Sequence, residues 1–197
     1  MASPPPDLAR LLAALTRALR DADLPFMLIG GQAVLLHGRP RLTEDIDITL
    51  GVGPERLPAL LAACSATGLT PLPADPAGFV AETFVLPARH AASGLRVDCI
   101  FSTTPYERDA IARAETVEIG GERVPVASAE DLVLHKLFAG RPRDLEDAVG
   151  VVQRKGVAMD WEYLRGVAAG FRDVPGREGL VAQVDALRRH AQQDPTS

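Results

Sequence analysis

The sequence has few cysteines, few aromatic residues and no long apolar run. Its two cysteines, Cys64 and Cys99, each stand among apolar residues, so we expect small buried hydrophobes and no disulfide framework. The longest apolar stretch, residues 26–36, is interrupted by Gly-Gly-Gln and is shorter than the ~20 residues that a membrane span needs. Three consecutive prolines stand where a signal peptide would have basic and then apolar residues. We therefore expect a cytoplasmic protein with no membrane contact.

The chain also lacks an excess of positive charge. Its net charge is −5, which excludes the general basic field of a dedicated nucleic-acid binder and leaves room only for a local RNA-binding patch. Only two of the 21 basic residues are lysines, Lys136 and Lys155. Because arginine stands almost everywhere else, a retained lysine suggests a position that needs a compact point charge.

Apolar periodicity predicts a mixed α/β part followed by helices. The expected strands are 24–29, 45–50, 83–86 and 95–101 with a hairpin at 116–126, and the expected helices are 7–21, 32–37 and 54–68, with a Pro-rich loop at 70–78. Ser128 and Asp131 form a capping-box pattern that begins a helix at 128–138, and apolar spacing predicts three further helices near 143–155, 160–171 and 178–190. We expect an α/β (α+β) fold with a small mixed sheet: a catalytic domain over 1–127, a helical region over 128–192 and a tail at 193–197.

Two aspartates share one face of the strand at 45–50. Polar and apolar residues alternate there, so Ile46 and Ile48 point to the core while Asp45 and Asp47 point together to the other side. Carboxylates held this close repel each other unless a cation lies between them. Mg²⁺ is the expected cation, because proteins hold it with one or two carboxylates together with substrate phosphates.

A glycine pair follows the neighbouring strand. Gly30 and Gly31 lie between the strand at 24–29 and the next expected helix. Residues without side chains let phosphate oxygens approach backbone amides near a helix N-terminus. The sequence thus places a phosphate-binding turn beside a metal-binding pair.

These motifs resemble the signature of the nucleotidyltransferase superfamily, which has the fold of DNA polymerase beta. The resemblance lies in Ile29-Gly30-Gly31, a spacing of thirteen residues, and Asp45-Ile46-Asp47-Ile48. It implies a third acid on a later strand, and Asp98 in Leu95-Arg96-Val97-Asp98 fits that position. By this resemblance Asp98 would help to hold the metal or act as base toward the acceptor.

A narrower resemblance is to AbiEii-type toxins of type IV toxin–antitoxin systems. It rests on the segments 30–33, 41–47 and 136–147. It implies that Lys136 faces the triphosphate of an NTP, that Arg41 contributes to nucleotide binding, and that a cognate antitoxin is a partner. Asp144 and Asp147 match the pattern less closely, and their role stays open.

Other interpretations remain. Asp98 could simply pair with Arg96, and Arg41 and Lys136 could be solvated surface residues. The acceptor could be a tRNA end, a protein or a small molecule such as an aminoglycoside. The alternative to an enzyme is a catalytically silent module that binds a nucleotide or a partner.

Overall fold

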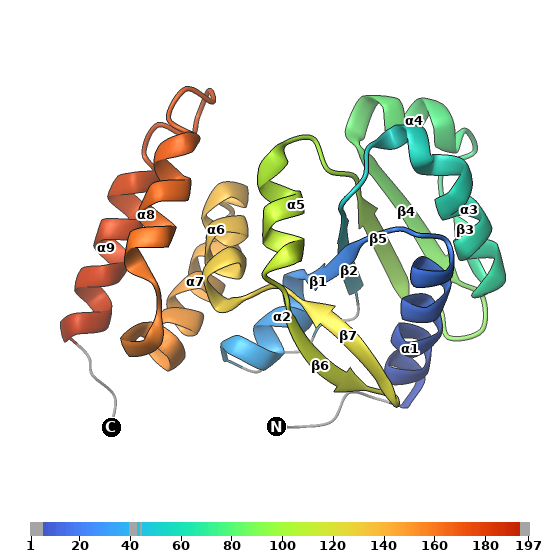
Figure 1. Ribbon diagram of the computed structural model, residues 1–197, viewed down its shortest axis with the longest axis horizontal. Coiled ribbons are helices and arrows are strands. Elements are labelled where there is room, and N and C mark those ends of the chain that lie inside the picture. Colours follow the sequence, from blue (N-terminus) through green and yellow to red (C-terminus); the bar gives the residue numbers. More distant parts are fainter. Residues whose placement is uncertain (1–5, 40–42, 44, 194–197) are drawn as a thin grey trace. The chain divides into compact units, whose positions relative to one another are not determined.

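The computed structural model describes residues 6–39, 43 and 45–193, which form two compact units (Figure 1). The described part of the first unit consists of residues 6–32, Thr43 and residues 45–127. The second unit joins residues 33–39 to the segment that begins at Ser128. None of the described helices is both long enough and apolar enough to cross a membrane.

The first unit is built on a mixed sheet. In spatial order the described strands are β3 (Leu69–Pro71), β4 (Val85–His90), β5 (Arg96–Ile100), β2 (Asp45–Leu50), β1 (Phe26–Ile29), β7 (Glu122–Val126) and β6 (Glu115–Ile119). The β2–β5 and β1–β7 pairs are parallel, and the other neighbours are antiparallel. The expected mixed α/β fold is confirmed.

The helices of the first unit pack on this sheet. The unit contains α1 (Pro6–Asp21), the start of α2 (Gly30–His37), the short helix η1 (Pro54–Arg56), α3 (Leu57–Ala66), α4 (Pro76–Thr83) and α5 (Pro105–Ala112). Helix α1 packs against β7 and α3 and buries Leu11, Leu15 and Leu19 completely or nearly so, as its apolar spacing predicts. Ile46 and Ile48 of β2 are also buried.

Three segments differ from the expectation. The Pro-rich stretch expected as a loop overlaps β3 and the start of α4. That helix begins there because Asp75 accepts a hydrogen bond from the Gly78 amide and Pro76 fits its first turn. Helix α5 was not anticipated; Thr104 and Glu107 form a capping box at its start. Helix α2 begins at Gly30 rather than Gln32, so the glycine pair is its first turn.

The second unit is helical. It comprises α6 (Ala129–Ala139), α7 (Pro142–Lys155), the short helix η2 (Gly156–Ala158), α8 (Trp161–Gly170) and α9 (Leu180–Gln193). The Ser128 side chain accepts a hydrogen bond from the Asp131 amide at the start of α6, as the capping pattern predicts. Gly140 ends that helix in the left-handed conformation.

Candidate active site

One face of strands β2 and β5 carries Asp45, Asp47 and Asp98, and we call it the aspartate face. On β2 the exposed Asp45 and the half-buried Asp47 alternate with buried isoleucines. Asp47 is the register partner of Asp98 on the parallel strand β5, and Asp45 is the partner of Arg96. Paired positions in a sheet project from the same face, so the structure brings the three predicted acids together on adjacent strands.

The aspartate face contains its own cation. Arg96 Nε donates to both carboxylate oxygens of Asp98, at 2.9 and 3.2 Å. The hydrogen bond to Asp98 and the nearby charges of Asp98, Asp45 and Asp47 raise the pKa of Arg96 above its ordinary value. The pairing of Asp98 with Arg96, weighed above as an alternative, is therefore present, and it offsets part of the repulsion among the three carboxylates.

The Asp47 carboxylate packs against Gly30, where only a residue without a side chain leaves space for it. A Cβ atom at position 30 would lie 1.8 Å from Asp47 Oδ2, so the carboxylate occupies the space that any side chain there would fill. Gly30 also has a φ of +64°, in the left-handed region that favours glycine. The turn and the aspartate pair are thus fitted to each other.

Gln32 is a positioning residue that the sequence interpretation missed. Its buried amide lies 3.5 Å from the Thr43 carbonyl oxygen and 3.4 Å from that of Asp45, which are long hydrogen-bond distances. A Cβ on Gly31 would meet Thr43 Oγ1 at 2.4 Å, so the residue two positions before β2 packs on the first turn of α2. The available signal was a polar amide within an otherwise apolar helix, since buried amides usually bind backbone carbonyls.

The donor set suits a magnesium ion that its substrate helps to hold. Among the described residues, no three His, Cys, Asp or Glu side chains form a ready metal cage. Arg96 holds Asp98, and Asp45 and Asp47 supply hard oxygen donors on the neighbouring strand, beside a turn suited to phosphate. Two carboxylates with phosphate oxygens are a usual magnesium environment, so these residues fit the ion.

Lys136 belongs to the second unit, where it is buried. Its Nζ lies 2.8 Å from Asp144 Oδ1 and 2.9 Å from Asp147 Oδ2, and all three side chains are at most 8% exposed. Arg141 Nε donates to Asp144 at 2.6 Å. Burial alone would raise the pKa of Asp144, but the hydrogen bonds from Lys136 and Arg141 outweigh it and hold that pKa below its ordinary value. The interpretation of Lys136 as a solvated residue is wrong: it joins α6 to the start of α7.

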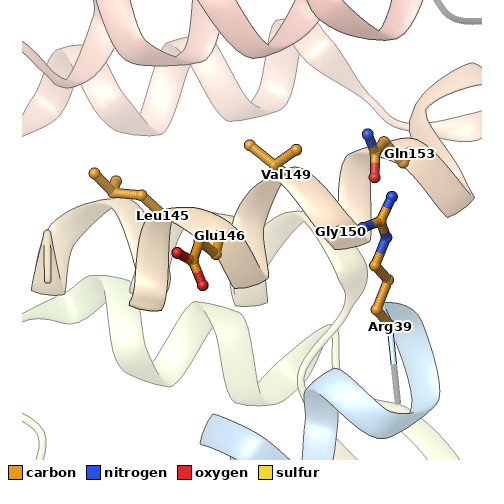
Figure 2. Close-up of a pocket in the computed structure, with 6 residues that line it drawn as sticks. All are labelled: Arg39, Leu145, Glu146, Val149, Gly150 and Gln153. Atoms are coloured by element: carbon orange, nitrogen blue, oxygen red, sulfur yellow. The ribbon is translucent and has the colours of Figure 1, made fainter. Parts of the chain in front are cut away.

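The second unit contains a cavity that involves none of the described candidate residues. The structure describes a cavity of about 340 Å³ on one side of α7 (Figure 2), lined by Arg39, Leu145, Glu146, Val149, Gly150 and Gln153. Its lining includes none of the predicted site residues that the structure describes. Arg41, predicted to bind nucleotide, lies outside the described residues.

Comparisons with solved structures identify the fold. The antibiotic-resistance factor ANT(2'')-Ia is 20% identical, with a TM-score of 0.56 over 95% of this chain and 98% of that chain. An antigenic nucleotidyltransferase-like protein from Paracoccidioides brasiliensis is 15% identical, with a TM-score of 0.63 over 98% of this chain and 94% of that chain. None of the curated proteins is similar enough to count as a match.

The sequence itself matches a protein family over most of its length. Residues 7–174 fit the family described as "Nucleotidyltransferase of unknown function (DUF6036)". This match spans both the aspartate face and the cluster of Lys136 with Asp144 and Asp147. The chain belongs to this family and is an enzyme of the nucleotidyltransferase class.

Proposed function

We propose that the protein transfers a nucleoside monophosphate from an NTP to a hydroxyl group of an acceptor, with Mg²⁺ held by Asp45 and Asp47. The observation that carries this proposal is the fit of Asp47 against Gly30, which sets a pair of carboxylates directly beside a side-chain-free helix start. Family membership makes the chain an enzyme and sets aside the silent module.

Each residue then has a defined task. The amides at Gly30 and Gly31 bind phosphate oxygens of the NTP near the positive end of α2. The acceptor oxygen attacks the α-phosphorus, the bond to the bridging oxygen breaks, and pyrophosphate leaves. Asp98 accepts the proton of the attacking hydroxyl, and Arg96 holds that carboxylate in place. Bound magnesium supplies charge neutralisation for the phosphates.

Lys136 and Arg41 complete the proposal for the nucleotide. Lys136 keeps the role of facing the triphosphate only if its ammonium exchanges a carboxylate partner for phosphate, because both of its described partners are aspartates. Arg41 is proposed as a second phosphate ligand by the resemblance to AbiEii-type toxins.

Labelling identifies the acceptor. Purified protein is incubated with each α-³²P-labelled NTP and Mg²⁺, together with either a cell extract or tobramycin. We expect label to move to a macromolecule of the extract, as for a toxin that acts on tRNA or protein and has an antitoxin partner. Label on tobramycin would instead assign the aminoglycoside alternative, which the fold shared with ANT(2'')-Ia favours. The absence of label in every reaction would contradict nucleotidyl transfer.

Gly30→Ala should stop transfer by a steric route. The new methyl group would collide with the Asp47 carboxylate and force it from its place, whereas the backbone strain at positive φ costs only about 1–2 kcal/mol. Gly121→Ala is the matched control, because Gly121 has a φ of +82° but nothing within 4 Å of an added Cβ. Both variants should show a similar loss in melting temperature from strain, and only Gly30→Ala should lose transfer. Equal activities would show that Asp47 needs no such fit.

A further inference from the structure

The aspartate face also carries two arginines, and both lie on the same side of strand β2. Arg96 on β5 is the register partner of Arg89 on β4, so Arg89 projects from the face that bears Asp98. The strand order is β4, β5, β2, β1. The arginines therefore lie on one flank of β2, and Gly30, which follows β1, lies on the other.

The guanidinium group of Arg89 has N–H donors that no described contact uses. It is exposed, and its Nη1 donates to the carbonyl oxygen of Gly94 at 2.9 Å in the β4–β5 turn. Within the part of the chain that the structure describes, it forms no ion pair with a carboxylate, unlike Arg96 with Asp98. A guanidinium group has five N–H donors, so the Gly94 contact anchors the side chain and leaves most donors available.

This arrangement favours an anion. Like charges directly opposite on neighbouring strands are unfavourable, and Asp98 compensates only Arg96. A phosphate group beside Arg89 would supply the missing charge and accept two parallel N–H bonds from the guanidinium fork.

We propose that Arg89 binds a phosphate group of the acceptor and thereby selects a phosphate-bearing acceptor over a polycationic one. This inference rests on the proposed function, in which the Gly30 flank takes the NTP phosphates and the acceptor hydroxyl reaches Asp98 from the opposite flank. The net charge of −5 gives no general attraction for such an acceptor, so the contact must be local. The phosphate can belong to a nucleic-acid strand or to a small phosphorylated alcohol.

Binding measurements on charge variants test the assignment. A fluorescent single-stranded RNA with a free 3′-hydroxyl and, separately, glycerol 3-phosphate are titrated into wild type, Arg89→Gln, Arg89→Lys and Arg10→Gln at several salt concentrations. Arg10 is the control, since it is exposed on α1, which packs against α3 and β7. We expect Arg89→Gln to weaken RNA binding about fivefold at 0.1 M salt and to reduce the logarithmic salt slope by about 0.7, with partial recovery in Arg89→Lys.

The possible results are distinguishable. An effect of Arg89→Gln on RNA affinity assigns a nucleic-acid acceptor, and an effect on glycerol 3-phosphate alone assigns a small one. Equal affinities of wild type and Arg89→Gln for both probes, with NTP binding intact, would overturn the inference and leave the proposed function standing. Failure of wild type to bind any NTP would instead count against nucleotidyl transfer.

Discussion

Asp47→Asn is expected to lower the rate of nucleotidyl transfer about a thousandfold and to leave the fold intact. The substitution removes one of the two carboxylates proposed to hold Mg²⁺, and loss of about 4 kcal/mol of transition-state stabilisation corresponds to that factor. The side chain keeps its shape, so the contact with Gly30 is preserved. Removing one negative charge relieves repulsion with Asp45 and Asp98 but weakens the attraction to Arg96, so the melting temperature should change little.

Pyrophosphate release and thermal unfolding are measured on the same preparations. Asp109→Asn is the control, because Asp109 is an exposed aspartate of α5 outside the proposed site. It should retain wild-type activity. Wild-type turnover in a double variant with Asn at positions 45 and 47 would refute the assignment of the metal to this pair.

Lys136→Met is expected to be the most destabilising of the substitutions considered. Removal of the ammonium leaves two buried carboxylates without their shared partner, and breaking a buried ion pair in this way typically costs about 3–5 kcal/mol. For a chain of this size that corresponds to a fall of roughly 10 °C in melting temperature. Denaturant unfolding measures the loss.

The control variants separate charge from packing. Combining Lys136→Met with Asp144→Asn and Asp147→Asn also removes the two buried carboxylate charges and should recover much of the stability, whereas Lys155→Met, at the other lysine, should have little effect. If the triple variant is no more stable than Lys136→Met alone, the cluster stabilises through packing and not through charge.

The same variant should show a characteristic pH dependence. In the wild type the pKa of Asp144 is lowered, so its stabilisation is present above about pH 4 and is lost as the pH falls through the folded pKa. In Lys136→Met, burial without the lysine favours the protonated carboxyl groups. The stability difference between wild type and variant should therefore narrow as the pH falls below about 5.

The sequence predicted the aspartate strand well because one physical rule governs it. Ile46 and Ile48 must face the core, and a period of two then places Asp45 and Asp47 on the opposite face. The family match agrees with the class of enzyme that these motifs predict, although the narrower relation to AbiEii-type toxins stays a proposal.

Features that depend on contacts between distant residues could not be predicted in this way. Local periodicity carries no information about the approach of Asp47 to Gly30, or about the pairing of Arg89 with Arg96 across two strands. The burial of Lys136 could not be predicted for a related reason: helical spacing does not show that Asp144 and Asp147, on the next helix, lie beside its amino group.

Helix α2 is divided between the two units. Its glycine turn belongs to the first unit, but residues 33–39 belong to the second, where Gly38 adjoins Val151 and its carbonyl oxygen accepts from Arg154. The boundary between Ala127 and Ser128 is therefore not a place where the protein can be cut into two independent modules. A fragment ending there would carry the end of α2 without the helices that bury it, and the complementary fragment would lack a segment of its own core. We therefore expect each unit to fold only when both are expressed in one polypeptide.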